Sequence, residues 1–253
     1  MMDKHWKKLQ KLFRILETPY YLRALMKTGT ASSTESEPFL KTCAPDLIVD
    51  VGANRGQFSL AARHWHPQAQ IIAFEPLTVP AGKYTRLFDG DDGVTLHKVA
   101  LSQVRGDVEM HVAQRDDSSS LLSFSSLQKT IAPGNEEIGR ETVKSGPLVD
   151  FVPEAELSRG RNLLKLDVQG SELEVLMSAA SILKRFDWIC AEASFFTIYE
   201  GQPLAHEIIG YLAGHGFKLA AMFNVTYVEG KKLVLQADMV FENAGRGGGL
   251  TVG

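Results

Sequence analysis

Four acidic residues each stand at the end of a short apolar stretch, where a carboxylate could take part in binding or catalysis. They are Asp50 in LIVDV, Glu75 in IIAFE, Asp167 in LLKLD and Glu192 in WICAE. A charge that closes a buried strand is costly unless it is paired or faces a cleft. Carboxylates in a cleft can hold a ribose diol, accept a proton or bind a divalent cation. The pattern predicts an acid-lined site, with turn capping, an Asp167–Lys165 ion pair or a loop position as the structural alternatives.

A glycine-containing turn follows the first of these stretches. The run Leu47–Val51 is apolar and β-branched, which predicts a buried strand, and the apolar spacing in Gln57–Trp65 predicts a helix. The turn between them, 52–56, has the sequence GANRG. Glycine tolerates positive φ and close approach of another group, and the free N–H groups at a helix start point out of the turn. This unit predicts a site for a small ligand.

The same turn bears on which ligand is bound. A dinucleotide fingerprint has the pattern G-x-G-x-x-G, but Asn54 occupies the position of its second glycine. Asp50, the turn and Glu75 nevertheless share the carboxyl edge of the predicted parallel strands, where an acidic residue can hold a ribose. These residues predict a nucleoside site and leave NAD and S-adenosylmethionine (SAM) both open.

The elements that must position these residues alternate between strand and helix. Apolar runs predict strands at Asp46–Val51, Gln70–Glu75, Val94–Leu101, Asn162–Val168 and Trp188–Ala193. Helical spacing predicts helices at Gln57–Trp65, Val79–Phe88, Ser171–Leu183 and Pro203–Gly214. This alternation indicates an α/β fold with a mostly parallel sheet covered on both faces. The last two runs, Phe217–Phe223 and Leu233–Phe241, predict a C-terminal hairpin that ends the sheet with an antiparallel strand.

Three segments lie outside this alternation. Residues 1–40 are expected to form an N-terminal helical extension and a polar linker, with a helix break near Pro19. The first helix is basic and amphipathic; it is expected to pack on the core, with a membrane-surface or dimer role as the alternative. Residues 102–161 are expected to be an insertion in the ligand-binding domain, 41–244, and the Gly-rich end, 245–253, a flexible tail.

Composition narrows the classes of protein to consider. The 253 residues are 44% hydrophobic and 23% charged, which fits one packed α/β domain with additions. The net charge of −3 gives no support for a nucleic-acid partner. Cys43 and Cys190 are too few for a disulfide scaffold, no signal peptide is recognised, and no run approaches the ~20 apolar residues of a membrane span. A cytoplasmic protein is expected.

A set of motifs in a fixed order carries a family resemblance: VDVGANRGQFSL, AFEP, KVALS, SSSLL and LLKLDVQGSELEVLMSA. Together they resemble the FkbM family of SAM-dependent methyltransferases over 46–192. The resemblance implies the class I Rossmann-like methyltransferase fold, SAM as cofactor, and O-methylation of small molecules, sugars or glycans. Matching by motif assigns residues to the amino-acid end of SAM (Asp50, Gly52, Asn54, Gly56), its ribose (Glu75), its adenine (Ala100, Leu101) and a covering loop (Ser119).

Two features of the site stay open at this stage. Around the adenine, the segment HKVALSQ offers only the side chains of Ser102 and Gln103, so contacts there would be mostly to the backbone. Asp167 is the first candidate for the base that accepts the hydroxyl proton, and Glu192 is the second. The same two carboxylates could instead hold a divalent cation, so a metal remains undecided.

Three classes of function are compatible with these residues. The favoured one is a SAM-dependent O-methyltransferase whose acceptor is a hydroxyl of a sugar, a glycan or another small molecule. An NAD-linked oxidoreductase on a similar sheet is disfavoured by Asn54 and by the final hairpin. A non-catalytic SAM-binding module is disfavoured by the acids Asp167 and Glu192. A homo-oligomer is compatible with all three classes.

Overall fold

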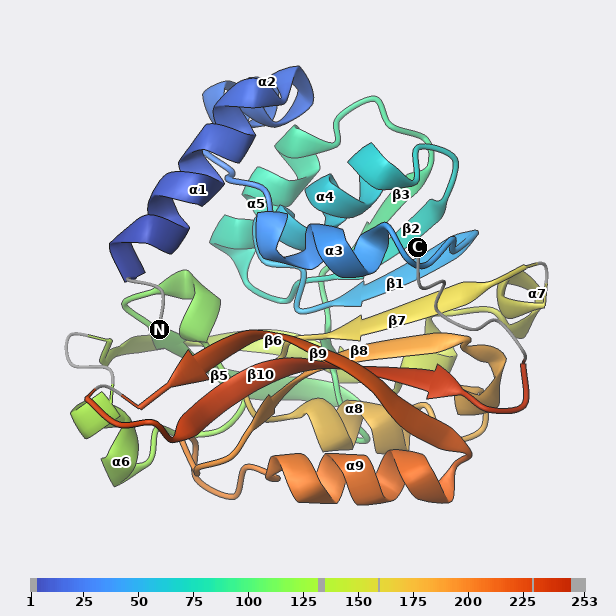
Figure 1. Cartoon of the computed structure of the whole chain (residues 1–253). Helices are drawn as coiled ribbons and strands as arrows, with labels where there is room; N and C mark the ends of the chain where they lie inside the picture. The colour runs from blue at the N-terminus through green and yellow to red at the C-terminus, as the bar shows by residue number, and fades with distance from the viewer. Residues whose placement is uncertain (1–3, 132–134, 159, 229, 247–253) are drawn as a thin grey trace.

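A seven-stranded sheet forms the centre of the computed structural model, which describes residues 4–131, 135–158, 160–228 and 230–246. Its strand order is β3-β2-β1-β7-β8-β10-β9 (Figure 1). The strands are β1 (Leu47–Val51), β2 (Gln70–Phe74), β3 (Val94–His97), β7 (Asn162–Leu166), β8 (Trp188–Ser194), β9 (Phe217–Tyr227) and β10 (Val234–Asn243). The first five are parallel, whereas β10 runs antiparallel to both β8 and β9. This is the class I Rossmann-like methyltransferase topology, so the predicted fold is confirmed.

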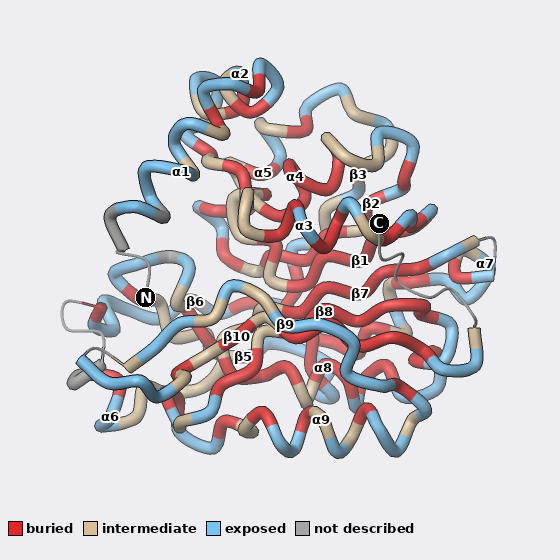
Figure 2. Tube along the Cα trace, in the orientation of Figure 1, coloured by how far each residue is buried: buried red, intermediate tan, exposed pale blue. Residues whose placement is uncertain are grey.

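Helices cover both faces of this sheet. One face carries α3 (Glu37–Leu40), α4 (Gln57–Trp65) and α5 (Thr78–Leu87), and the other carries α8 (Glu172–Ser178) and α9 (Ala205–Gly214) (Figure 1). Alternate residues of a strand point to opposite faces. Val49 and Val51 therefore join a core with residues of α8 and α9, whereas Ile48 joins a core with residues of α3 and α4. Burial on both faces explains the almost unbroken apolar sequence of β1, and Figure 2 shows buried residues along the central strands.

The segment after β3 forms a second, smaller sheet. Its strands are β4 (Ala100–Leu101), β5 (Gly106–Ala113) and β6 (Glu137–Gly146), in the order β4-β6-β5. The prediction of one strand at Val94–Leu101 is wrong, because β3 pairs with β2 while β4 pairs with β6. The chain leaves the main sheet between these two strands. Short helices complete the segment: η2 (Asp116–Ser118), α6 (Ser126–Ile131), η3 (Leu148–Asp150) and α7 (Glu154–Leu157).

Two helices, α1 (Lys4–Glu17) and α2 (Pro19–Thr28), precede the sheet. The predicted break at Pro19 is confirmed, since this residue begins α2. The polar stretch predicted to be a linker instead contains a 3-10 helix, η1 (Thr34–Ser36), that runs directly into α3. Glutamates of this stretch form ion pairs with basic residues of α1, which explains why it is ordered.

Other boundaries differ from the predicted ones by a few residues. The helix predicted at Ser171–Leu183 ends at Ser178, and η4 (Leu183–Arg185) is a separate 3-10 turn that buries Leu183 in the core. The C-terminal hairpin is present and its strands are longer than predicted. Most of the tail predicted at 245–253 lies outside the described residues.

Two expectations from composition can be compared with the coordinates. Across the described ranges, no helix is both long enough and apolar enough to cross a membrane. Cys43 and Cys190 are buried free thiols. Burial raises the pKa of the Cys190 thiol well above its ordinary value, as expected for a small hydrophobic core residue.

Candidate active site

A cavity of about 260 Å³ lies at the carboxyl ends of β1, β2, β7 and β8. Most of the residues singled out in the sequence line it: Gly52, Asn54, Glu75, Ala100, Leu101, Ser119, Asp167 and Glu192. Asp50 and Gly56 do not line it. The carboxyl edge of a parallel sheet is where ligands bind in such folds, because the loops that leave the strands meet there. The structure thus brings residues from distant parts of the chain to one wall.

Glu75 is held rigidly at one side of this cavity. Its side chain is only 5% exposed. Asn54 donates its backbone N–H to Oε2 of Glu75 at 2.9 Å, and Leu77 donates its backbone N–H to Oε1 at 2.9 Å. Asn54 itself has φ of 47°, a left-handed conformation that asparagine tolerates better than most residues. The turn thus points a fixed carboxylate into the cavity, where it can accept hydrogen bonds from a diol.

Gly52 marks a close approach of two loops. Its φ is 74°, and a Cβ atom on it would overlap the backbone carbonyl oxygen of Asp167. The carbonyl oxygen of Gly52 also accepts a hydrogen bond from Lys165 Nζ at 3.3 Å. The loop after β1 and the loop after β7 therefore touch through the backbone, which fixes the positions of both walls of the cavity.

Replacing Gly52 by Ala is expected to lower the free energy of unfolding. Gly29 has nearly the same φ, 72°, but nothing lies within 4 Å of the Cβ that alanine would add there. Gly29→Ala therefore reports the backbone strain alone, and Gly52→Ala adds the overlap with Asp167. We expect Gly52→Ala to cost about 1–3 kcal/mol more than Gly29→Ala, measured by urea unfolding. Equal losses in the two variants would show that the close approach does not constrain the loop.

Asp50 lies outside the cavity and contacts Lys165, which lines it. Its side chain is fully buried, accepts a hydrogen bond from Ser59 Oγ at 2.6 Å and lies 3.4 Å from Lys165 Nζ. Tyr84 donates its hydroxyl to Ser59 Oγ at 2.9 Å, which extends this buried network. Asp50 therefore acts on the cavity through Lys165. Gly56, with φ of 91°, begins α4 and leaves no room for a side chain against Phe88.

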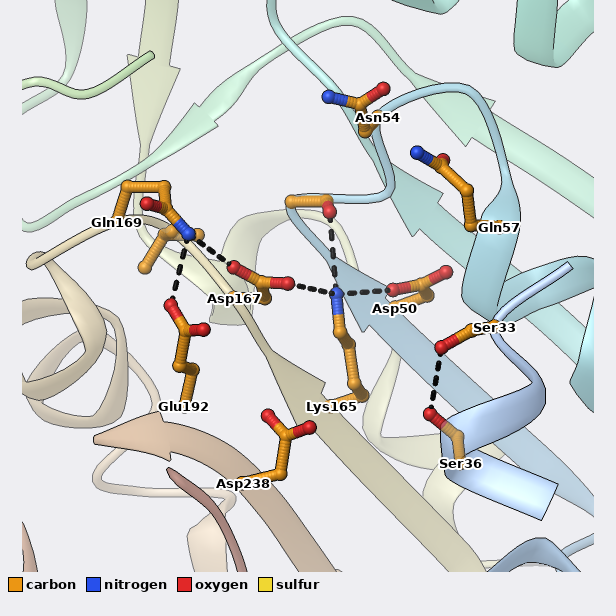
Figure 3. Close-up of polar contacts among 12 residues, drawn as sticks. Ser33, Ser36, Asp50, Asn54, Gln57, Lys165, Asp167, Gln169, Glu192 and Asp238 are labelled. Carbon is orange, nitrogen blue, oxygen red and sulfur yellow. Dashed lines mark hydrogen bonds and ion pairs between the residues drawn. The ribbon is translucent and has the colours of Figure 1, made fainter. Parts of the chain in front are cut away.

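Acidic side chains surround the other side of the cavity (Figure 3). The Gln169 amide nitrogen lies between two of them, donating to Asp167 Oδ1 at 2.7 Å and to Glu192 Oε2 at 3.0 Å. The Lys165 ammonium lies 3.6 Å from the other oxygen of Asp167. The ion pair of Asp167 and Lys165 that the sequence left as an alternative is thus present, while 38% of the Asp167 side chain stays exposed.

The position of Gln169 depends on the loop that follows β7. Gln169 has φ of 52°. Glu172, the first residue of α8, accepts hydrogen bonds from the backbone N–H groups of Val168 and Gly170, at 3.0 and 3.1 Å. Tyr199 donates its hydroxyl to Oε1 of Gln169 at 2.8 Å, which orients the amide so that its nitrogen faces the acids. The strained residue is therefore held from both sides.

Asp238 on β10 is a third acid of this wall that sequence reasoning missed. It stands opposite Glu192 in the register of β8 and β10. Its Oδ2 accepts a hydrogen bond from Asn224 Nδ2 at 3.0 Å, and both residues line the cavity. Only the pairing of the hairpin with β8 brings Asp238 to the site. The sequence signal was a charge within a mostly apolar run.

Burial and mutual repulsion shift the proton affinities of these acids. Burial raises the pKa of Asp238 to about 7, and the charge of Asp167 adds to this effect. Burial, followed by the charges of Asp167 and Asp238, raises the pKa of Glu192 well above its ordinary value. Burial would lower the pKa of Lys165, but Asp167 and Asp50 outweigh it and raise that pKa. At neutral pH, Lys165 is therefore charged and Asp238 is near its midpoint, while the raised pKa of Glu192 favours its protonated form.

Polar residues from the N-terminal segment and the hairpin close the acid side of the cavity. They are Lys11, Ser33, Glu35, Ser36 and Asn224. The Ser33 and Ser36 hydroxyls are 2.9 Å apart (Figure 3). In the described part of the chain, no group of three or more His, Cys, Asp or Glu side chains is arranged to hold a metal ion. This wall offers donors and acceptors suited to a hydroxylated molecule.

The residues present fit the cofactor that the sequence resemblance implies. Three strand spacings separate Glu75, after β2, from Glu192 on β8, which places them about 14 Å apart along the sheet edge. The turn between them packs on the loop after β7 at Gly52 and lines the cavity with Gly52, Ala53 and Asn54. A carboxylate for a ribose, a glycine turn and an acidic end for a sulfonium and its acceptor thus follow one another along a single cavity.

Comparison with known proteins gives a consistent result. The model of the methyltransferase FkbM domain matches residues 50–219. The chain is 28% identical over 186 residues to the 2-O-methyltransferase NoeI of Sinorhizobium fredii, covering 71% of this chain and 75% of that protein. It is 32% identical over 152 residues to the methyltransferase sdnD of Sordaria araneosa, covering 51% and 59%. The crystal structure of precorrin-6y C5,15-methyltransferase from Geobacter metallireducens aligns over 84% of this chain and 93% of that chain, with a TM-score of 0.44 and 14% identity.

Proposed function

Because the chain belongs to the FkbM methyltransferase family, it is a SAM-dependent methyltransferase, and we propose that it methylates a hydroxyl oxygen of a sugar, a glycan or another hydroxylated small molecule. The observation that carries the proposal is the acidic wall of the cavity, which offers a proton acceptor beside the expected position of the sulfonium. A neutral hydroxyl is a poor nucleophile, so its proton must leave as the new bond forms. The 2-O-methyltransferase NoeI is a relative whose name states transfer to oxygen.

A few fixed groups on the cofactor side of the cavity would hold SAM. Glu75 would accept hydrogen bonds from the ribose hydroxyls, and Gly52 and Asn54 would line the amino-acid end. Ala100, Leu101 and Ser119 would enclose the adenine side. Asp50 and Gly56 contribute indirectly, by holding Lys165 and the start of α4. SAM supplies an electrophilic methyl group on its sulfonium, and the protein aligns the acceptor with it.

The acid side of the cavity handles the acceptor and its proton. Asp167 accepts the hydroxyl proton, because it lines the cavity and keeps part of its side chain exposed. Lys165 and the Gln169 amide fix the two oxygens of Asp167 in place. Glu192, whose pKa burial raises well above its ordinary value, can donate a hydrogen bond to the acceptor in its protonated form. Lys11, Glu35 and Asn224 line this side of the cavity.

An acceptor screen tests the proposed reaction. The purified protein is incubated with SAM labelled in its methyl group and with separate pools of sugars, nucleotide sugars, glycans and hydroxylated natural products. We expect label in at least one hydroxylated pool, as a methyl ether that resists mild base. Transfer to a nitrogen, or to a carboxylate as a base-labile ester, would contradict the proposal.

Replacing Glu75 by Ala is expected to weaken SAM binding by at least about tenfold, because each charge-assisted hydrogen bond to the ribose contributes roughly 1.5–3 kcal/mol. The affinity is measured by calorimetry. Glu154→Ala is the matched control, since Glu154 is an exposed glutamate that pairs with Arg185 outside the cavity. An unchanged dissociation constant in Glu75→Ala would place the ribose elsewhere.

Turnover is expected to rise as pH increases through about 7. Asp238, whose pKa burial raises to about 7, gains its negative charge in this range. The added negative charge favours movement of the acceptor proton toward the acidic wall of the cavity. The rate is measured at saturating SAM from about pH 5 to about pH 9. Asp238→Asn should flatten the profile, and a step that persists there would belong to another group, such as Glu172, whose pKa is also raised to about 7 by burial.

A further inference from the structure

Helix α1 lies outside the residues that match the family domain, and it packs on the protein in an inverted way. Lys11 forms an ion pair with Glu35 at 3.0 Å and Arg14 forms one with Glu37 at 2.9 Å, so the charged side of the helix faces the protein. Ile15 is the one side chain of α1 that the structure describes as buried. A helix of a globular protein ordinarily does the opposite and packs its apolar stripe on the core.

The outward side of α1 is apolar along its length. Its exposed large hydrophobic side chains are Trp6, Leu9, Leu12, Phe13 and Leu16. They recur at three- and four-residue spacing, which gathers them on one side of the helix. Trp6 is 51% exposed and Phe13 is 55% exposed. Figure 2 shows the trace of α1 mostly in the colour of exposed residues, at the margin of the molecule. We call this surface the α1 apolar face.

The charge around this face is strongly positive. Residues 1–28 contain seven Lys and Arg against two Asp and Glu, whereas the rest of the chain has 20 against 28. Lys8 on α1, and Arg23 and Lys27 on α2, are exposed. A basic helix with tryptophan, phenylalanine and leucine on its other side is the pattern of helices that lie flat at a lipid–water interface. The rest of the chain has a net charge of −8 (20 − 28), so the excess of positive charge lies in this segment.

We propose that the α1 apolar face docks on an anionic membrane surface. The apolar side chains would enter the headgroup region, and the basic side chains nearby would contact lipid phosphates. A second copy of the chain fits less well, because two faces docked on each other would bring together two segments that each carry a net charge of +5. Negatively charged lipid matches both the apolar and the electrostatic character of this corner.

The position of α1 connects this surface with the reaction. Lys11 pairs with Glu35, and both residues line the acid side of the cavity. A second groove beside the cavity shares Lys11, Glu35 and Asn224 with it and continues along α1 and α3. A protein docked through α1 would therefore hold the acceptor side of its cavity close to the lipid surface. The docking itself rests on α1 and α2 and is independent of the identity of the acceptor.

Vesicle flotation with the full-length protein tests the proposal. The parent protein should float with vesicles made of phosphatidylglycerol and phosphatidylcholine in equal parts, and bind vesicles of phosphatidylcholine alone much more weakly. Phe13→Gln should reduce binding to the anionic vesicles by about tenfold or more, because a buried aromatic side chain is lost from the interface. The matched control is Val104→Gln, since Val104 is a loop residue that is 56% exposed and distant in sequence.

Two further measurements keep the interpretation unambiguous. Trp6 is the exposed residue among the three tryptophans, so its fluorescence emission should shift to shorter wavelength when anionic vesicles are added to the parent. SAM affinity and the melting temperature without vesicles should be the same in the parent and in Phe13→Gln. Absence of binding to anionic vesicles at low salt would overturn the proposal. It would also be overturned by a parent that is a dimer in ultracentrifugation and becomes monomeric in Phe13→Gln, with no effect of vesicles.

Discussion

Replacing Asp167 by Asn is expected to lower turnover by about 10²–10⁴, the usual contribution of a general base, while SAM affinity changes little. Asparagine has the same shape and keeps an oxygen that can accept the hydrogen bond from Gln169. It lacks the basicity needed to take the acceptor proton. Turnover is measured with the acceptor found in the screen, and SAM affinity by calorimetry on the same preparation.

A matched control for this variant is Asp150→Asn. Asp150 has almost the same side-chain exposure as Asp167, 37% against 38%, and it also pairs with a basic residue, Arg105. It lies outside the cavity, so its replacement should leave turnover unchanged. If Asp167→Asn melts at a lower temperature but has near-normal turnover per folded molecule, Asp167 has a structural role. A bound cation would instead be indicated if a chelator removed the activity of the parent and Asp167→Asn had no activity at all.

The cofactor side of the site could be predicted from the sequence because its determinants are local. The strand, the glycine turn and the helix that contain Gly52 and Asn54 occupy a single stretch of the chain. Glu75 lies at the end of the next strand, and consecutive parallel strands share an edge of the sheet. Fold class followed from the same information, since alternating strands and helices have few ways to pack.

The acceptor side could be predicted only in part. Asp167 and Glu192 were expected at the site because each follows an apolar run, but the other residues of this side meet only through tertiary structure. Asp238 reaches the cavity through the antiparallel register of β10 with β8, and a shift by one residue would turn it to the opposite face. Ser33 and Ser36 lie in a stretch whose polar composition predicted a linker. Its order depends on ion pairs with α1 that no local pattern encodes.

The two sides of the cavity are coupled through Lys165. Its ammonium lies within 3.6 Å of Asp50, Asp167 and the carbonyl oxygen of Gly52, and so joins the strands β1 and β7 to the loop of the cofactor side (Figure 3). The single ammonium of Lys165 thereby pairs with the fully buried carboxylate of Asp50 and with the carboxylate of Asp167, which faces the cavity. This arrangement explains why a lysine follows two leucines in a buried strand. It also predicts that stability and catalysis share this residue.

Replacing Lys165 by Met is expected to lower the free energy of unfolding by about 3–5 kcal/mol, because removing one partner of a buried ion pair leaves the other charge uncompensated. Methionine fills most of the volume of the lysine side chain, so little of the loss should come from a cavity. Asp50 is fully buried, and its Oδ1 has no hydrogen bond to replace the ammonium. Urea unfolding followed by circular dichroism measures the loss.

The matched control is Lys144→Met, which removes an exposed ion pair with Asp107 and should cost no more than about 1 kcal/mol.

The sign of the pH dependence follows from the raised pKa of Lys165. A lysine whose pKa is higher in the folded state stabilises the protein fully below the pKa of an unfolded lysine, about 10.4. That contribution is lost only as pH rises through the folded value. The contribution of Lys165 to the difference in free energy of unfolding between the parent and Lys165→Met should therefore stay constant from neutral pH to about pH 9. A loss no larger than that of Lys144→Met would show that Asp50 does not depend on Lys165 for its burial.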